Sequence, residues 1–249
     1  MLSLYVFGML LVRHCGQSQI VAMLCSLYKW NYNTVRQRLR ELTYESRAKR
    51  GTGRTTLDVQ KCFAPLLGWV LSKFQGEHRQ VVLALDATYL KDRFIILAVS
   101  VVVAGCAIPV AWHIRKANEK GKWNPIWKTL LSHLVPVMPA QWKVFVLTDS
   151  GLYSKPLFEN IRNKGWYPMM RIEGAQGLFQ STSCSRWHPI RQFAYEGMQA
   201  RCIQGLCFKG DPLRCTLVVQ WTTGCQKPCL LVTSLPPQQI QHNVYAIRY

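Results

Sequence analysis

Residues 81–86 have the sequence VVLALD, and residues 143–149 have the sequence KVFVLTD. Each is a short apolar run typical of a buried strand, and each ends on an aspartate, Asp86 or Asp149. If the two strands are neighbours in one sheet, the two carboxylates converge at its carboxyl edge. Carboxylate oxygens are ligands that Mg²⁺ prefers, so the pattern indicates a magnesium site. The alternative is that each aspartate only caps the turn that follows its strand.

The elements around these two runs favour an α/β protein with a mixed sheet. Strands are expected at residues 81–86, 94–103, 107–114, 143–149 and 167–172, and helices at 123–134 and 155–164. The resulting order along the chain is strand, strand, strand, helix, strand, helix, strand. This is the order of a ribonuclease-H-like sheet.

Two apolar stretches raise the alternative of a membrane protein. Residues 94–112 contain no charge over nineteen positions, which is the length of a spanning helix. Gly105 and Pro109 in the middle, together with many β-branched residues, favour two buried strands joined near 104–105. Residues 1–12 are apolar but lack the positive n-region and the cleavage site of a signal peptide. We therefore expect a cytoplasmic protein with no membrane partner.

The composition indicates a folded protein with a polyanionic partner. The chain has 249 residues, of which 49% are hydrophobic, so it can bury a core and is not a disordered protein. It has 31 Lys+Arg against 12 Asp+Glu, a formal net charge of +19. A surplus of this size usually faces nucleic acid or an anionic membrane. The ten cysteines lack the paired spacing of a zinc knuckle, and we expect free thiols.

The N-terminal part has the spacing of a helix-turn-helix. A first helix capped by Ser18 and a second helix capped by Asn33 or Thr34 are expected on either side of a break at 29–33. One face of the second helix is apolar. The other face carries Arg36, Arg38 and Arg40, which suit phosphates or base edges. A surface helical hairpin with a solvated basic face is the alternative.

The C-terminal part changes character. From about residue 173 to 235 the sequence is rich in expected strands, at 203–208, 215–221 and 230–234. Pro236 and Pro237 then open a helix with an apolar stripe. The expected domains are a helical DNA-binding region at 1–75, a catalytic core at 76–172, a β-rich insertion at 173–235 and the start of a C-terminal helix at 236–249.

The ordered set of short motifs resembles the DDE transposases of insertion sequences, and within them the group named after insertion sequence four. The two acidic motifs are LALDAT at 83–88 and VLTDSGLY at 146–153. Further matches are PVAW at 109–112, GWYPMMRI at 165–172 and LVTSLPP at 231–237. The resemblance runs from about residue 18 to the last residue.

The last motif of this family is a tyrosine, two residues, an arginine, three residues and the third catalytic acid, a glutamate. Tyr245 and Arg248 fit its beginning and are expected to contact DNA phosphate. On a helix, positions 245, 248 and 252 share one face. Position 252 lies beyond the last residue, so we expect this copy to be truncated before its third acid. Ser150 and Ser234 depart from the family pattern, which has arginine at the first position and an acid or amide at the second.

The resemblance implies DNA transposition. Asp86 and Asp149 would hold Mg²⁺ or Mn²⁺, which drives hydrolysis at the element's ends and attack of the freed 3′ hydroxyl on target DNA. The partner would be double-stranded DNA, bound by a homodimer associated with a prokaryotic nucleoid. The alternative is a DNA-binding remnant that occupies element ends without cleaving them. Glu159 and Glu173 lack the motif's context, and we expect neither to complete the site.

In relatives the β-rich insertion contributes to a DNA hairpin step. Two tryptophans and four basic residues of this segment could stack on or neutralise a strand: Trp187, Trp221, Arg186, Arg191, Arg201 and Lys209. Trp221 sits at the end of an apolar strand, so we expect it to be a core residue.

Overall fold

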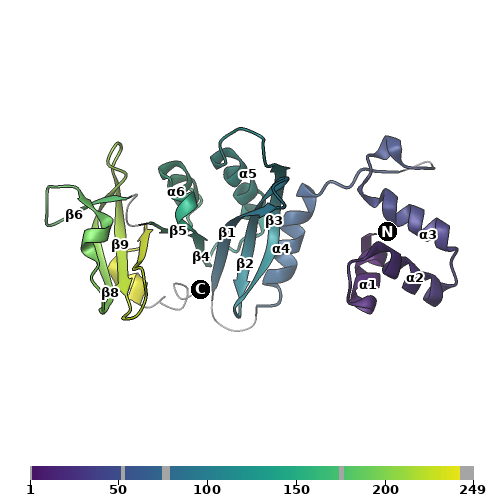
Figure 1. The fold of residues 1–249 in the computed structure, drawn as a ribbon, viewed down its shortest axis with the longest axis horizontal. Helices are drawn as coiled ribbons and strands as arrows, with labels where there is room; N and C mark the ends of the chain where they lie inside the picture. Colours follow the sequence, from purple (N-terminus) through teal and green to yellow (C-terminus); the bar gives the residue numbers. More distant parts are fainter. Residues whose placement is uncertain (1, 52–53, 75–78, 174–176, 242–249) are drawn as a thin grey trace. The chain divides into compact units, whose positions relative to one another are not determined.

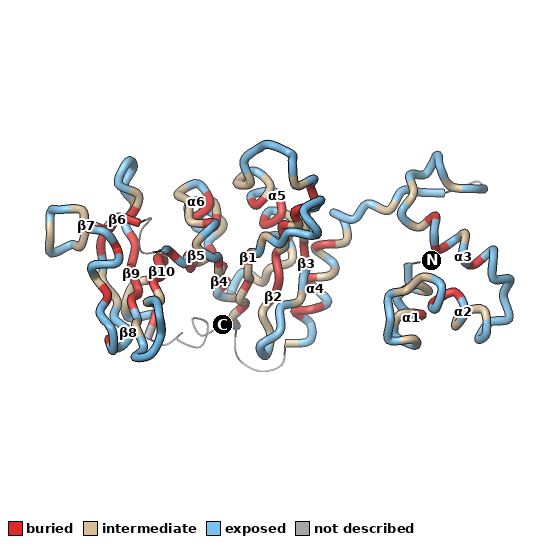
Figure 2. Tube along the Cα trace, viewed as in Figure 1, coloured by how far each residue is buried: buried red, intermediate tan, exposed pale blue. Residues whose placement is uncertain are grey.

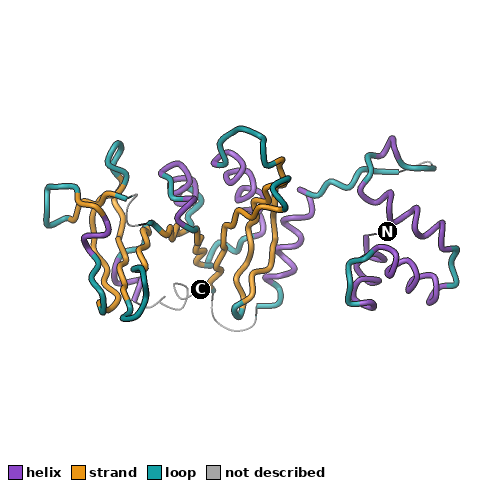
Figure 3. Tube along the Cα trace, viewed as in Figure 1, coloured by secondary structure: helices purple, strands orange, loops and turns teal. Residues whose placement is uncertain are grey.

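A computed structural model describes residues 2–51, 54–74, 79–173 and 177–241. The chain divides into two compact units, Met1–Val59 and Gln60–Tyr249, which we call the N-terminal and C-terminal units. The first is built from helices, whereas the second combines helices with a large mixed sheet (Figures 1 and 3). The expected mixed sheet is therefore confirmed.

The N-terminal unit packs three helices around a small core of its own. The helices are α1 (Leu2–Val12), α2 (Gln17–Tyr28) and α3 (Tyr32–Arg40), followed by the 3₁₀ turns η1 (Glu41–Thr43) and η2 (Ser46–Ala48). The buried residues are Ile20, Val21, Leu24, Val35 and Leu39. Helix α1 passes close to α2 at Gly8, where a Cβ would lie 2.5 Å from Cγ2 of Ile20. Only glycine allows this close approach.

The break between α2 and α3 is where it was expected, but the helix caps are different. Lys29 ends α2 in the left-handed conformation, at φ 56°. The side chain of Asn31 caps α3, and its Oδ1 accepts a hydrogen bond from the backbone N–H of Thr34 at 3.2 Å. The predicted caps Ser18, Asn33 and Thr34 are thus wrong. Each helix begins earlier than predicted, so those residues already lie in the helical first turn, where they cannot cap it.

The first half of the sheet of the C-terminal unit contains the five strands predicted around the aspartates. They are β1 (Gln80–Leu90), β2 (Phe94–Val103), β3 (Cys106–Lys116), β4 (Lys143–Thr148) and β5 (Tyr167–Arg171). Their order in the sheet is β3-β2-β1-β4-β5. β1, β2 and β3 are antiparallel neighbours, whereas β4 runs parallel to both β1 and β5. The uncharged residues 94–112 therefore form two strands, as predicted.

The second half continues the same sheet. It contains β6 (Leu178–Ser181), β7 (His188–Pro189), β8 (Met198–Cys207), β9 (Leu213–Trp221) and β10 (Cys229–Thr233). β10 pairs antiparallel with β5, and the order goes on as β5-β10-β9-β8-β6-β7. The three predicted strands of this region are confirmed. The short strands β6 and β7 were not predicted, because two to four residues are too few to show an alternating pattern.

The two faces of the sheet are covered differently. The main core lies between β1–β5 and the helices α4 (Phe63–Leu71), α5 (Asn124–Leu134) and α6 (Lys155–Arg162) (Figure 2). On the opposite face, a smaller cluster contains Phe145, Met169, Val218, Leu231, Leu235 and Ile240. Ile240 belongs to helix α7 (Pro237–Gln241), so α7 lies on this second face. We call it the α7 face.

Helix α4 belongs to the C-terminal unit. It lies within the range 1–75 that was expected to form a DNA-binding region, but its residues Phe63, Leu67 and Val70 are buried in the main core. Short 3₁₀ turns complete the unit: η3 (Gln60–Cys62), η4 (Val135–Val137), η5 (Ser150–Leu152) and η6 (Ile190–Phe193). Among the helices in the described ranges, none has both the length and the apolar character needed to span a bilayer.

Candidate active site

The register of two neighbouring strands places Asp86 beside Asp149. β1 and β4 are parallel, and the last residue pair between them is Leu85 with Thr148. Asp86 and Asp149 are the next residues on the two strands and so occupy matching positions on strands about 4.8 Å apart. β1 continues past Asp86 to Leu90 in its pairing with β2, so the prediction that this strand ends on the aspartate is wrong. It is the pairing with β4 that ends there.

Both carboxylates lie on the α7 face of the sheet. Successive side chains of a strand point to opposite faces, so Asp86 shares a face with Val82, and Asp149 shares one with Leu147. Val82 and Leu147 both pack against the cluster of the α7 face. The backbone of Asp149 is still extended, at φ −75° and ψ 177°, so the alternation reaches it. Two like charges therefore stand side by side on one surface.

The two aspartates are exposed and are not used as turn caps in the way the alternative required. Oγ1 of Thr88 donates a hydrogen bond of 2.5 Å to Oδ2 of Asp86, which fixes the orientation of that carboxylate. Asp149 precedes η5, but its side chain makes no capping hydrogen bond to that turn. The carboxylate of Asp149 lies close to Gly151: a Cβ added to this glycine would be 3.5 Å from Oδ1 of Asp149. Because both side chains are exposed, neither carboxylate carries the free-energy cost of burial.

Arginine follows the aspartates in the next strand. Thr148 pairs with Met170 of β5, so Arg171 occupies the position beside Asp149. Arg171 lies two residues after Met169 and so shares its face of the strand. Met169 belongs to the cluster of the α7 face. Asp86, Asp149 and Arg171 thus form one row across β1, β4 and β5, with two negative charges followed by a positive one.

A basic cavity begins at this row. It has a volume of about 670 Å³, and its lining includes Ser150, Arg171, Glu173, Arg191 and Lys227. Lys227 forms an ion pair of 3.2 Å with Glu173, in which both side chains are at least half exposed. Three cations therefore face one carboxylate, and the surplus of positive charge suits an anionic ligand.

Arg191 is held in this cavity by two contacts. Its guanidinium carbon lies 4.0 Å from the centre of the Trp221 ring, and its Nη1 donates a hydrogen bond of 2.9 Å to the carbonyl oxygen of Ala194. Trp221 is half-buried against the main core, and its Nε1 donates to the carbonyl oxygen of Cys225 at 2.8 Å. The core position predicted for Trp221 is confirmed, and its ring additionally orients an arginine.

The two other candidate acids are engaged in ion pairs of their own. Glu173 pairs with Lys227, and Glu159 on α6 lies 3.5 Å from Nζ of Lys155. Lys155 also pairs with Asp211, and these neighbours raise the pKa of the lysine, Asp211 having the larger effect. Within the described ranges, no group of three or more histidine, cysteine, aspartate and glutamate side chains is arranged to hold a metal ion. The motif residues Tyr245 and Arg248 lie outside those ranges.

The arginines predicted to bind DNA lie on the exposed side of α3. Val35 and Leu39 of this helix are buried, whereas Arg36, Arg38 and Arg40 are exposed. Glu41, at the end of α3, is buried, and its Oε1 accepts a 2.6 Å hydrogen bond from Gln37. The surface of α3 therefore presents positive charge, and its adjacent acid is turned inward.

Arg171 and Lys227 were not singled out as site residues from the sequence, whereas Arg191 was named only as one of four basic residues of the insertion that could neutralise a strand. Arg171 could have been predicted, because it ends a parallel strand at the same edge of the sheet as the aspartates. Arg191 and Lys227 come from η6 and from the loop before β10, where no periodicity marks them. Only the pairing of β10 with β5 brings their segments to the row of charges.

Comparison with known proteins gives structural matches only. No protein-family model matches the sequence, and no curated protein is significantly similar to it. Similar solved structures include a cryo-EM structure of the piggyBac transposase synaptic complex with hairpin DNA, at 13% identity and a TM-score of 0.41. The match covers 93% of this chain and 51% of that one. The crystal structure of the Mos1 strand transfer complex matches at 13% identity and a TM-score of 0.24, over 60% of this chain and 51% of that one. The chain thus spans about half the length of these two proteins.

Proposed function

We propose that this chain is a DDE-type transposase chain, which binds DNA and cleaves its phosphodiester bonds with the help of divalent cations. The observation that carries the proposal is the register between β1 and β4, which sets Asp86 beside Asp149 on one face. Two solvated carboxylates at matching positions repel each other, and a bound cation relieves this repulsion. Such an arrangement is typical of a metal site and adds nothing to the packing of the sheet.

The strand order supports the ribonuclease-H-like form of this proposal. Three antiparallel strands, followed by two parallel strands inserted next to the first, give the order β3-β2-β1-β4-β5. The first acid stands on the central strand β1 and the second directly follows its neighbour β4. The helix α7 lies on the same face as both acids.

The residues fit a hard cation. Asp86 and Asp149 offer exposed carboxylate oxygens, the ligand type that Mg²⁺ and Mn²⁺ prefer, and Thr88 fixes the orientation of Asp86. When bound, the cations would activate the attacking oxygen and stabilise the leaving oxygen of the phosphodiester. Arg171, next to Asp149, would hold a phosphate oxygen of the same strand. Arg191 and Lys227 would neutralise the phosphates that follow it in the basic cavity.

The N-terminal unit would supply affinity for duplex DNA. Arg36, Arg38 and Arg40 line the exposed side of α3, where they can reach phosphates or base edges of a groove. The net charge of +19 supports long-range attraction to the duplex. We further propose that two chains act together on paired ends.

The experiment that tests the metal site is local cleavage of the protein by bound iron. Fe²⁺ replaces Mg²⁺ at carboxylate sites, and with ascorbate and peroxide it cuts the backbone nearby. We expect cuts near residues 86 and 149 that excess Mg²⁺ suppresses and that Asp149→Asn removes. Asp92→Asn, the same change in the exposed turn after β1, should leave the cuts in place. Cuts elsewhere, or none, would refute the site.

Catalysis is tested separately, on supercoiled DNA that carries the sequences flanking the gene. A transposase predicts nicking that requires Mg²⁺ or Mn²⁺ and disappears in Asp86→Asn and Asp149→Asn. The DNA-binding remnant predicts salt-dependent retention of the same DNA without any nicking.

A further inference from the structure

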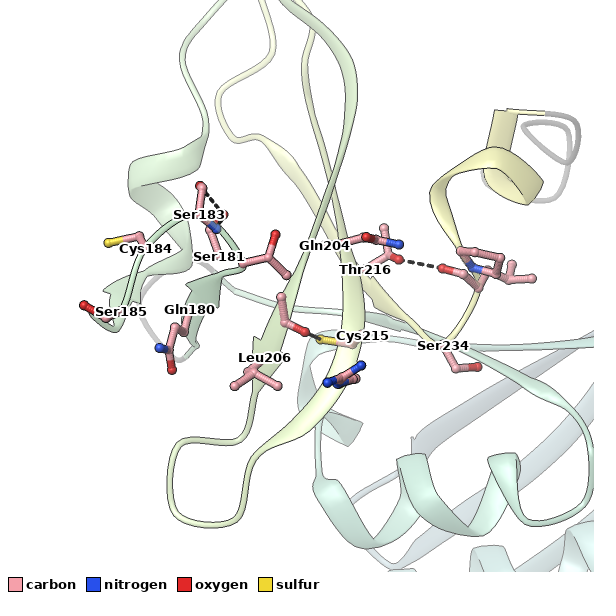
Figure 4. Close-up of a pocket in the computed structure, with 15 residues that line it drawn as sticks. Gln180, Ser181, Ser183, Cys184, Ser185, Gln204, Leu206, Cys215, Thr216 and Ser234 are labelled. Atoms are coloured by element: carbon pink, nitrogen blue, oxygen red, sulfur yellow. Dashed lines mark hydrogen bonds between the residues drawn. The ribbon is translucent and has the colours of Figure 1, made fainter.

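A second cavity lies in the β-rich half of the sheet, away from the row of charges. It has a volume of about 720 Å³ and lies between the loop after β6, the strands β8 and β9, and the segment that leads into α7 (Figure 4). This volume falls within the range of about 300–1,000 Å³ that is usual for ligand sites. Nothing in the proposed cleavage of DNA uses it.

The lining of this cavity mixes polar and apolar residues and contains no carboxylate. Hydroxyl groups come from Ser181, Ser183 and Ser234, and amides come from Gln180 and Gln204. Arg214 of β9 is the one charged residue among the residues lining the cavity. Hydroxyls, amides and arginine are the side chains that proteins use to contact phosphate. None of the residues lining the cavity is aromatic, so it offers no surface on which a base could stack.

The cavity lies on the α7 face, the face that also carries the two aspartates. Gln204 of β8 pairs with Thr216 of β9. Two residues away on each strand, Cys202 and Val218 pack in the cluster of the α7 face. By the alternation of side chains, Gln204 and Thr216 project to the same face. A DNA chain that follows this face therefore has polar contacts on both sides of α7.

The walls are fixed by hydrogen bonds and close backbone packing. Oγ1 of Thr216 donates a 2.6 Å hydrogen bond to the carbonyl oxygen of Leu235, and the N–H of Leu235 donates to Oγ1 of Thr233 at 3.2 Å (Figure 4 shows the first). These bonds hold the segment before α7 against β9. On the other side, a Cβ at Gly205 would lie 2.1 Å from the carbonyl oxygen of Gln180, so only glycine lets β6 approach β8. The cavity is thus formed before any ligand binds.

We propose that this cavity binds the sugar–phosphate backbone of a single DNA strand, with Arg214 and the surrounding hydroxyls and amides on its phosphates. The identity of the ligand as DNA rests on the proposed function. A duplex is too wide to enter a hollow of this volume. Because no aromatic ring is available, binding depends on the backbone and is independent of the bases.

The test measures the occupancy of the cavity itself, using the full chain. A thiol introduced by Gln204→Cys lies in the cavity. Gln199→Cys places an equally exposed thiol on the same strand β8, outside the lining. The rate of alkylation at each introduced thiol is followed by peptide mass spectrometry. The additions are ten-nucleotide oligo-dT, an abasic strand of the same length, and a blunt duplex.

We expect both single strands to slow alkylation at position 204 at least fivefold and to leave position 199 unchanged. The duplex should protect neither thiol. Protection by oligo-dT without protection by the abasic strand would mean that bases are recognised and would overturn the proposal. Equal protection by the duplex would overturn it as well.

Arg214→Gln, made in the Gln204→Cys chain, should raise the strand concentration needed for half protection by about tenfold, the effect of losing a charged hydrogen bond to phosphate. Arg162→Gln removes the same charge from α6, outside the cavity, and should change this concentration less than twofold. If the chain still binds DNA in a gel-shift assay but position 204 is not protected, the cavity is not a strand site and the proposed function is unaffected. Failure to bind any DNA at low salt would refute the proposed function itself.

Discussion

Replacing one of the paired aspartates should make the protein more stable while removing its response to metal. Asp86 and Asp149 lie on strands about 4.8 Å apart, at matching positions of the same face. Two unit charges at about 5 Å in water repel by roughly 1 kcal/mol, and the exposure of both side chains justifies the solvent dielectric. Asp86→Asn keeps the shape of the side chain and removes this repulsion, and the residue on its other side, Ala98 of β2, carries no charge. We expect unfolding of the C-terminal unit to shift upward by roughly 2–4 °C at low salt.

With a bound cation, the natural chain should become the more stable protein and the variant the less stable one. Mn²⁺ at ten times its dissociation constant would stabilise the natural chain by about 1.4 kcal/mol and Asp86→Asn hardly at all. Both effects are measured by scanning calorimetry of the full chain, with and without Mn²⁺ at about 5 mM, because a weak site of two carboxylates is expected to have a millimolar dissociation constant.

The double-mutant cycle makes this test specific for the pair. Asp86→Asn should stabilise the metal-free protein. Asp149→Asn should change its stability less, because it also removes the attraction between Asp149 and the neighbouring Arg171. The double variant should be no more stable than Asp86→Asn, because one substitution already removes the repulsion. In 1 M salt the gain should shrink, since the Debye length is then about 3 Å. Additive changes, or an Asp86→Asn variant that is less stable without metal, would show that the two carboxylates do not face each other.

Three further outcomes are expected. The salt dependence of duplex binding, measured as the slope of log K against log salt, should fall by about 0.9 in each of Arg36→Gln, Arg38→Gln and Arg40→Gln. Arg162→Gln, on the helix-covered face of the sheet, should leave this slope unchanged. Equal slopes in all four variants would exclude α3 from the interface. The pKa of Glu41 is lowered by the hydrogen bond from Gln37, by the backbone of Arg50 and by Arg54, against the opposing effect of burial. The ionised carboxylate therefore stabilises the folded N-terminal unit above the usual pKa of 4.5, and this stabilisation is lost as pH falls through the lowered pKa. The protection factors of the α3 amides, which correct for the pH dependence of intrinsic exchange, should therefore fall below pH 4.5, and Glu41→Gln should remove this acid dependence. Gly205→Ala should destabilise the C-terminal unit by about 1–3 kcal/mol in chemical denaturation because its Cβ meets the backbone of Gln180, whereas Gly210→Ala, with open space around it, should cost less than about 0.5 kcal/mol.

The sheet was predictable because its strands carry strong local signals. β2 and β3 are rich in β-branched residues and are separated by Gly105, and both were placed to within two residues. The helix caps were not predictable in the same way. Asn31, Asn33 and Thr34 are all suitable cap residues. The tertiary packing of Val35 and Leu39 decides which of them caps the N-terminus of α3.

The candidate site was predicted in part. The sequence showed two apolar runs ending on acids, and the condition that their strands be neighbours is met by β1 and β4. Their role as metal ligands stays a prediction. Arg191 was named from the sequence as a possible strand contact, but its position in the adjacent cavity, and that of Lys227, could not be found locally because both residues reach the cavity only through long-range pairing in the sheet. The extension of β1 to Leu90 was missed because its last residues, from Asp86 on, are mostly exposed and polar on one side.

The pairing of β10 with β5 has a consequence for how this protein can change over evolutionary time. The chain leaves β5 at Arg171 and returns beside it as β10, with Leu231 opposite that residue. The entry and exit of the intervening segment are therefore neighbours, and the entropy of closing such a segment grows only slowly with its length. Strands can be gained or lost between these points without moving the strands that carry Asp86 and Asp149. The β-rich half is the part in which new binding properties can arise while Asp86 and Asp149 keep their positions.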